Sequence, residues 1–193
     1  MSDSKQLEFY FDYASPYAFL ANETLGEHFP GIEINYKPIY LRGLETFRTA
    51  MPFVPNKLKY IMKDIFRCAK QTESDLKFPS HFPINGIYAC RGALFALANG
   101  GFDAYHQSMF RAAWSENKNT SDKQTVIDIA VEAGQNRNAF AAGIDHPALK
   151  EQLKNATQKA EQAGLFGVPS FIVNDELFWG CDRIEQVKQK LAI

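Results

Sequence analysis

The sequence predicts an α/β fold in which a strand–helix–strand unit opens the chain, a strand–strand–helix unit closes it, and an all-helical insertion separates the two. Three observations predict this class. Strand patterns occur near both ends of the 193-residue chain, the opening connection has the length of a βαβ crossover, and the stretch between carries only helical patterns. We expect residues 1–44 and 166–193 to form one domain and residues 45–165 to form a helical insertion domain.

The opening unit begins with an apolar and aromatic run from Leu7 to Phe11, which is typical of a buried strand. Ser15 is a good N-cap, and Pro16 suits the first position of a helix because its missing N–H costs nothing there. Residues 32–37 then alternate between apolar and polar side chains, which predicts a second strand.

The insertion shows apolar residues at helical spacing, and glycines follow several of the runs. The predicted helices cover residues 55–72, 85–98, 102–114, 121–133 and 147–164. We interpret Met62 and Phe66 on the first of them as core residues, and Ser121 with Gln124 as a capping box. Residues 138–142 predict only a short turn.

The closing unit returns to strand patterns. Residues 170–173 and 176–179 predict two strands joined by a tight turn at Asn174 and Asp175. Asp182 then predicts the cap of a final helix, because an acidic residue follows it three positions later.

Composition and charge narrow the possible functions. A formal net charge of −1 gives no basic excess for binding a phosphate backbone, so we do not expect nucleic-acid binding. The apolar runs fall far short of the roughly 20 residues that a membrane-spanning helix needs. Residues 1–5 also lack the pattern of a secretory signal, so we expect a cytoplasmic protein without membrane association. The four histidines and three cysteines show no metal-ligand spacing and no closely spaced cysteine pair, so we expect neither a metal site nor a disulfide framework.

Three local features point to one ligand site. Ser15 lies at a helix start directly after a strand, where unpaired N–H groups and the helix dipole favour an anion. Gly167-Val168-Pro169 stands just before the third strand, where a cis peptide would expose backbone for pairing with an extended peptide. Gly180-Cys181-Asp182 precedes the last helix, where N–H groups and a carboxylate could hold the charged end of a peptide ligand.

Each feature also has a purely structural interpretation. Ser15 and Asp182 could act only as helix caps, and Pro169 could be an ordinary trans turn residue. A helix N-terminus lowers the pKa of a thiol, but Cys181 could equally be inert packing. Lys57, near a helix start, is most simply a solvated side chain.

The order of the units, with a proline before the third strand, resembles a thioredoxin fold with a helical insertion, as in bacterial disulfide oxidoreductases of the DsbA type. Those proteins carry Cys-x-x-Cys where this chain has Ser15-Pro16-Tyr17-Ala18. Dithiol exchange needs two thiols at that helix start, so the sequence disfavours this activity.

Five motifs carry a closer resemblance that extends over nearly the whole chain. They lie at residues 9–17, 55–60, 78–85, 166–171 and 177–183, and the third reads Phe-Pro-Ser-His-Phe-Pro-Ile-Asn. In these motifs the chain is similar to the 2-hydroxychromene-2-carboxylate isomerases and to the kappa-class glutathione transferases. The third motif and the aromatic residue before Trp179 look more like the isomerases.

The resemblance implies that glutathione is the cofactor and that Ser15 lies beside its sulfur as the catalytic residue. The backbone at Val168 and Pro169 would pair with the cysteinyl part of glutathione, and residues 180–182 would hold its γ-glutamyl end. The resemblance implies further candidates: Lys57, Trp179, Gly180, Cys181 and Asp182 for the cofactor, and Arg42, Asn85 and Tyr88 for an aromatic acid substrate.

This chain departs from the family pattern at two places. Cys181 stands where a polar residue is more usual, which should matter little because a backbone N–H can do the same work. A Gly-Asn pair often found after the second strand is absent between Arg48 and Phe53, and this bears on the identity of the substrate.

The implied activity converts 2-hydroxychromene-2-carboxylate, or a similar aromatic catabolite, to a product of the trans-hydroxybenzylidenepyruvate type. Ser15 would donate a hydrogen bond that favours the glutathione thiolate, and the thiolate would add to a conjugated carbon, permit rotation and then leave. The resemblance also implies a homodimer. Two alternatives stay open: a kappa-like glutathione transferase or peroxidase, and a non-catalytic thioredoxin-like module that binds a peptide at the strand edge beside Pro169.

Overall fold

The computed structural model describes residues 6–48 and 54–193. The sequence observations on residues 1–5 and on the segment between Arg48 and Phe53 lie outside these described residues. The described chain contains a four-stranded sheet with the strand order β2-β1-β3-β4. The strands are β1 Gln6–Phe11, β2 Glu33–Pro38, β3 Ser170–Val173 and β4 Glu176–Trp179.

Strand β1 joins the two ends of the chain within this sheet. It pairs in parallel with β2, where Phe9 lies opposite Tyr36, and antiparallel with β3, where Phe9 lies opposite Phe171. Strands β3 and β4 form a hairpin whose turn residues, Asn174 and Asp175, both adopt positive φ angles. The expected opening and closing units therefore share one sheet.

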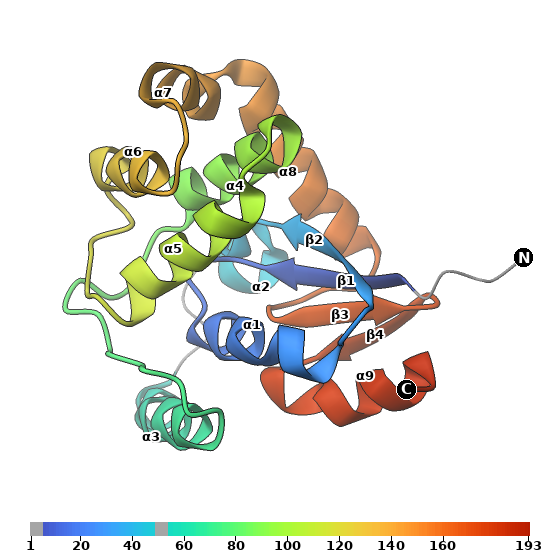
Figure 1. Cartoon of the computed structure of the whole chain (residues 1–193). Coiled ribbons are helices and arrows are strands. Elements are labelled where there is room, and N and C mark those ends of the chain that lie inside the picture. Colours follow the sequence, from blue (N-terminus) through green and yellow to red (C-terminus); the bar gives the residue numbers. More distant parts are fainter. Residues whose placement is uncertain (1–5, 49–53) are drawn as a thin grey trace, which may run out of the picture.

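Helices cover both sides of the sheet (Figure 1). In that view α1 (Pro16–His28) and α9 (Ile184–Leu191) lie below the strands, and helices α4 to α8 gather above them. The remaining elements are η1 Leu41–Gly43, α2 Glu45–Arg48, α3 Pro55–Gln71, α4 Ile87–Asn99, α5 Phe102–Trp114, α6 Lys123–Glu132, α7 Arg137–Asp145, α8 Pro147–Gln162 and η2 Cys181–Arg183. No helix of residues 6–48 and 54–193 combines the length and the apolar character that crossing a membrane requires.

Two expectations about the insertion are wrong in detail. Residues 138–142 belong to helix α7 and are not a short turn, because the Asn136 side chain accepts a hydrogen bond from the Ala139 N–H at 3.0 Å and starts the helix. The cap of α6 is Asp122 and not Ser121, since the Asp122 carboxylate accepts from the Thr125 N–H at 2.8 Å.

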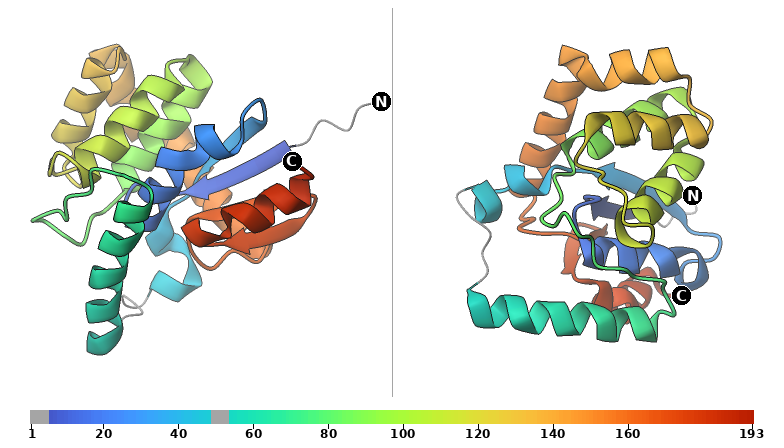
Figure 2. Two further views of the ribbon diagram at one scale, coloured as in Figure 1. Left: turned by 60° about the horizontal axis from the view of Figure 1, so that its bottom comes forward. Right: turned by 90° about the vertical axis from the view of Figure 1, so that its left-hand side faces the viewer.

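Two further expectations, about a helix cap and a core residue, are wrong. Asp182 does not cap the final helix: it lies within η2, and α9 begins at Ile184 without a side-chain cap. Phe66 is not a core residue, because its side chain is 45% exposed. Only Ile65 and Ala69 of α3 are buried, and Figure 2 shows this helix standing apart from helices α4 to α8.

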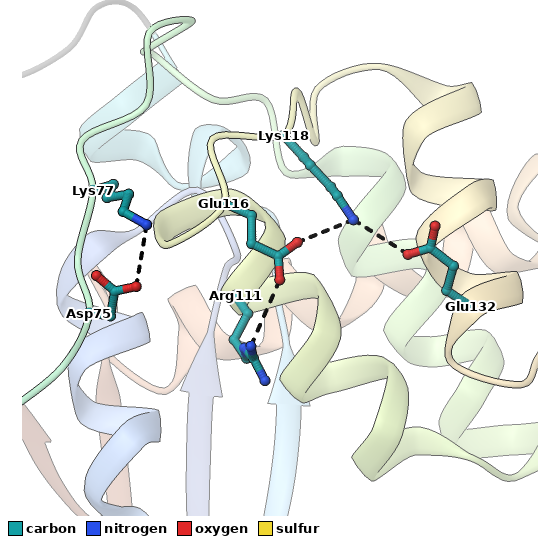
Figure 3. A network of polar contacts seen from close by, with 6 residues as sticks. All are labelled: Asp75, Lys77, Arg111, Glu116, Lys118 and Glu132. Carbon is teal, nitrogen blue, oxygen red and sulfur yellow. Dashed lines mark hydrogen bonds and ion pairs between the residues drawn. The ribbon is translucent and has the colours of Figure 1, made fainter.

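Ion pairs on the outside of the insertion join α5, the loop after it and α6 (Figure 3). Lys118 contacts Glu116 at 3.1 Å and Glu132 at 3.4 Å, and Arg111 lies 3.9 Å from Glu116. All these side chains are well exposed to solvent, so each pair contributes at most about 1 kcal/mol. This network therefore contributes little to the stability of the insertion compared with its interior packing.

An aromatic core connects the sheet to α5. The His106 ring of α5 packs against Phe11 with ring centroids 4.6 Å apart. His106 Nε2 lies 2.8 Å from the side-chain oxygen of Asn22, so it carries the proton, and Nδ1 accepts from the Tyr13 hydroxyl at 2.9 Å. Burial lowers the pKa of His106 to about 3. The sequence did not single out this neutral histidine.

We predict that His106 makes the protein less stable in acid. The folded pKa is about 3 and the ordinary value is about 6.5, so the folded state resists protonation that the unfolded chain accepts. The contribution of neutral His106 to the free energy of unfolding is complete above about pH 6.5. It is lost as the pH falls toward 3, by at most about 1.4 kcal/mol per pH unit. Urea unfolding of wild type and His106→Gln at several pH values tests this. Both proteins share the same carboxylates, so the difference between them removes the pH dependence that carboxylate protonation causes. A constant difference in unfolding free energy across that range would contradict the prediction.

Candidate functional site

The β1–α1 loop carries Ser15, which is 5% exposed and caps α1. Its Oγ accepts a hydrogen bond from the Ala18 N–H at 3.2 Å, as expected of an N-cap. The same hydroxyl donates to the carbonyl oxygen of Val168 at 3.2 Å. Ser15 is therefore both a cap and the link between the two ends of the chain.

A buried carboxylate, Asp12, holds this loop in place. Its Oδ1 accepts from the Ala14 N–H at 2.9 Å and from the Cys90 thiol at 3.4 Å, and its Oδ2 accepts from the Leu41 N–H at 2.7 Å. Burial raises the pKa of Asp12, and the two N–H donors counter that rise. The carboxylate thus connects the loop to η1 and to α4.

The structure brings Val168 and Pro169 beside Ser15, as the sequence predicted. The Val168–Pro169 peptide bond is cis. Pro169 accepts a hydrogen bond from the Gly180 N–H at 3.0 Å, which holds the start of η2 next to the start of β3. Within the described chain the Val168 N–H has no hydrogen-bond partner, so it can pair with a ligand.

Residues 180–182 complete one side of the candidate site. Gly180 has a φ of 116°, which a side chain would strain, and η2 follows it. The Asp182 carboxylate is exposed, and its one ion pair in the described structure is with Arg183 at 3.3 Å. Trp179 is 50% exposed and packs on Phe166 with ring centroids 4.9 Å apart. An exposed aromatic pair and an exposed carboxylate therefore flank the cis-proline segment.

The predicted substrate residues do not all meet at one place. Arg42 lines a shallow, solvent-open pocket together with Ala14. Asn85 is engaged locally, because its N–H donates to Ser121 and its side chain accepts from Ile87. The remaining pocket walls are Asp12, Tyr40, Leu41, Phe47, Phe82, Pro83, Ile84 and Gly86.

Two other predicted residues lie outside that pocket lining. The half-buried ring of Tyr88 lies under the Arg91 guanidinium at 5.6 Å. Lys57 is exposed on the first turn of α3. In the part of the chain that the structure describes, no group of three or more His, Cys, Asp or Glu side chains is arranged to hold a metal ion.

A polar cluster at the junction of α1, α3 and η2 was missed from the sequence. The Tyr17 hydroxyl donates to Asp64 at 2.9 Å, and the Cys68 sulfur lies 4.0 Å from the same carboxylate oxygen. Burial raises the pKa of Tyr17, and Asp64, Cys68 and Cys181 act in the same direction. The side chains of this cluster come from α1, α3 and η2, so no spacing along the sequence could have grouped them.

Comparison with known proteins shows which family the chain belongs to. The family model of the DSBA-like thioredoxin domain matches residues 6–192. A 2-hydroxychromene-2-carboxylate isomerase of Sphingobium xenophagum is 28% identical over 97% of this chain and 98% of its own length. Human glutathione S-transferase kappa 1 is 25% identical over 97% of this chain and 91% of its own length.

A solved structure agrees with these sequence matches. The structure of a selenomethionine 2-hydroxychromene-2-carboxylate isomerase superposes with a TM-score of 0.84 at 28% identity, covering 97% of this chain and 94% of that one. The expected thioredoxin-like fold with a helical insertion is confirmed. The relatives support an isomerase or transferase-like role.

We predict that Gly86→Ala destabilises the protein by about 1–3 kcal/mol through overpacking. A Cβ at position 86 would overlap the Asp12 Oδ1, which cannot move aside without losing its donors. Gly26→Ala is the matched control, because nothing lies within 4 Å of a Cβ there and alanine favours the helix. Denaturant unfolding of both variants measures the effect, and equal stabilities would show that Asp12 is not tightly held.

Proposed function

Because the chain belongs to the DSBA-like thioredoxin-domain family, we propose that it is a glutathione-dependent isomerase of the 2-hydroxychromene-2-carboxylate type. The observation that carries the proposal is the Ser15 hydroxyl, which lies at the start of α1 and reaches the carbonyl of Val168 before a cis proline. A hydroxyl at that position can bind a thiolate and cannot form a disulfide with it. This favours a borrowed thiol as the nucleophile over a thiol of the chain.

In this proposal glutathione lies extended across the cis-proline segment. Its cysteinyl backbone pairs with the free N–H of Val168, as an added strand would. The γ-glutamyl end reaches η2, where the exposed Asp182 carboxylate binds its ammonium group and the backbone of residues 180–182 binds its carboxylate. Trp179 borders this path, and Lys57 is the candidate partner for the glycyl carboxylate.

The thiolate is stabilised by groups that the chain supplies. When glutathione binds, the Ser15 hydroxyl turns from Val168 toward the sulfur and donates a charge-assisted hydrogen bond. The dipole of α1 acts in the same direction because its N-terminus carries partial positive charge. Ser15 is not a base, so the thiol proton leaves to solvent.

The substrate then undergoes reversible addition. The thiolate forms a carbon–sulfur bond to a conjugated carbon, and the electron pair moves onto the carbonyl of the substrate. The former double bond rotates as a single bond, and the electrons return to expel the thiolate with the new geometry. Glutathione is regenerated, so the reaction consumes none of it.

Arg42 is the residue that best suits the carboxylate of an aromatic acid. It lines the pocket that also contains Ala14, next to the Ser15 loop, and its planar guanidinium binds a carboxylate with two hydrogen bonds. Phe47 and Phe82 in the same pocket offer apolar contacts for a ring. Asn85 and Tyr88 remain candidates for the outer part of the substrate, and a homodimer remains part of the proposal.

A kappa-like transferase is the second candidate, because human glutathione S-transferase kappa 1 aligns over 97% of this chain. A transferase consumes glutathione with an electrophile. The isomerase changes the absorbance of a chromene acid in a glutathione-dependent reaction without net loss of glutathione. A thioredoxin-like binding module would do neither and would prefer longer peptides.

We predict that Ser15→Ala keeps glutathione binding within about threefold but abolishes the fall in thiol pKa on binding. Loss of one hydrogen-bond donor to the reacting group should lower kcat about 100-fold. Calorimetric titration gives the affinity, and thiolate absorbance followed against pH gives the pKa. Ser15→Thr, which keeps the hydroxyl and the cap, is the control. An unchanged thiol pKa in wild type would remove Ser15 from the mechanism.

We also predict that Asp182→Asn weakens glutathione binding about tenfold, or about 1.4 kcal/mol, because it removes the charge opposite the ammonium group. The pKa shift of the bound thiol should remain, since Asp182 is not placed to reach the sulfur. Asp175→Asn in the exposed β3–β4 turn is the matched control. Equal affinities of the two variants would refute the γ-glutamyl assignment.

A further inference from the structure

Helix α3 carries Lys57, the proposed partner of the glycyl carboxylate, but little of this helix is buried. Its two buried residues are Ile65 and Ala69, and both lie in its C-terminal half. Figure 2 shows α3 standing apart from helices α4 to α8, so those helices contribute little to its position. The position of Lys57 relative to the candidate site therefore depends on the packing of α3 against α1.

A hydrogen bond joins α3 to the first turn of α1. The Tyr17 hydroxyl donates to Asp64 Oδ2 at 2.9 Å, and Tyr17 lies two residues after Ser15. Arg67 lies 4.0 Å from the other oxygen of Asp64. Burial raises the pKa of Tyr17 and the Asp64 carboxylate raises it further, so the hydroxyl keeps its proton and remains the donor. The bond is charge-assisted, which makes it stronger than a bond between neutral groups.

Lys57 and Asp64 lie on the same side of α3. They are seven residues apart, which is close to two turns of an α-helix and about 10 Å along its axis. The bond from Tyr17 turns this side of the helix toward the start of α1 and thereby orients Lys57 toward the Ser15 loop. Because Lys57 lies at the end of α3 away from the buried Ile65 and Ala69, a tilt of the helix would displace it most.

We propose that Tyr17 and Asp64 are positioning residues, whose hydrogen bond holds α3 so that Lys57 reaches the glycyl carboxylate of glutathione bound beside Ser15. This inference rests on the proposed function. Neither side chain is assigned a contact with the reacting sulfur or with the substrate, and both act through the orientation of α3. Loss of the bond should leave the stabilisation of the thiolate by Ser15 intact and weaken only the contact with the glycyl end.

The first test measures whether the bond holds α3, and it needs no ligand. Tyr17→Phe removes the hydroxyl and keeps the ring, so amide hydrogen exchange in α3 should become at least about threefold faster, with α4 and α5 unchanged. Tyr10→Phe is the matched control, because it removes a similar bond to a carboxylate, that of Glu8 at 2.8 Å, within β1. Equal exchange in α3 of wild type and Tyr17→Phe overturns the proposal.

The second test measures binding by calorimetry, with glutathione and its glycyl ethyl ester as the two ligands. The ester lacks the negative charge that Lys57 is proposed to bind. Tyr17→Phe should weaken glutathione binding about fivefold, the most that an exposed ion pair contributes, and change binding of the ester by less than about twofold. The fall in the thiol pKa on binding should remain, because Ser15 is unaltered. Equal weakening of both ligands would overturn the role assigned to Lys57.

Further variants separate positioning from a merely structural role. Asp64→Asn keeps an acceptor for the Tyr17 hydroxyl and should retain the affinity for glutathione, whereas Asp64→Ala should match Tyr17→Phe. In a Lys57→Gln background, Tyr17→Phe should cause no further loss, since both changes remove the same contact, and additive losses would contradict this. If wild type binds neither ligand, the proposed function fails, while hydrogen exchange still decides whether the bond holds α3.

Discussion

The Asp12 carboxylate lies in the interior with donors from three parts of the chain: the loop that it begins, η1, and a cysteine of α4. A buried carboxylate without such partners costs several kcal/mol, so the three segments must stay assembled around it. Gly86 is part of the same constraint, because the oxygen occupies the space that any larger residue would fill. The position of Ser15, three residues after Asp12, follows from this arrangement.

The sheet then supplies the second half of the site. Strand β1 is central, so β3 must run beside it, and the segment that enters β3 comes to lie next to the loop that leaves β1. This explains why a hydroxyl near the start of the chain bonds a carbonyl near its end. The hydrogen bond from Gly180 to Pro169 extends the same surface to η2. Phe82 and Ile84 of the helical insertion line the same shallow pocket as Arg42. Ala14 also lines it, so the pocket lies beside the start of α1.

Local patterns predicted the parts of the fold that depend on local forces. Strands β1, β3 and β4 follow from apolar runs and one tight turn, and the capped start of α1 follows from Ser15 and Pro16. The failures arise where tertiary contacts decide. Phe66 has the spacing of a core residue, yet α3 has too little of the protein against it to bury that ring. The hydrogen bonds between His106 and Tyr13 and between Tyr17 and Asp64 each join distant segments, and no single segment carries a signal for either.

The chain places a hydroxyl, and not a thiol, at the start of α1. At the start of α1 the chain has a hydroxyl, which can stabilise a thiolate there but cannot be oxidised to a disulfide. The partly exposed thiols lie instead at η2 and α3, where burial and neighbouring carboxylates keep them protonated. Because the raised pKa values keep these thiols protonated in neutral solution, they are weak nucleophiles toward a sulfur bound at Ser15. Under the proposed mechanism this matters directly, because a glutathione thiolate trapped as a mixed disulfide could neither add to a substrate nor leave it.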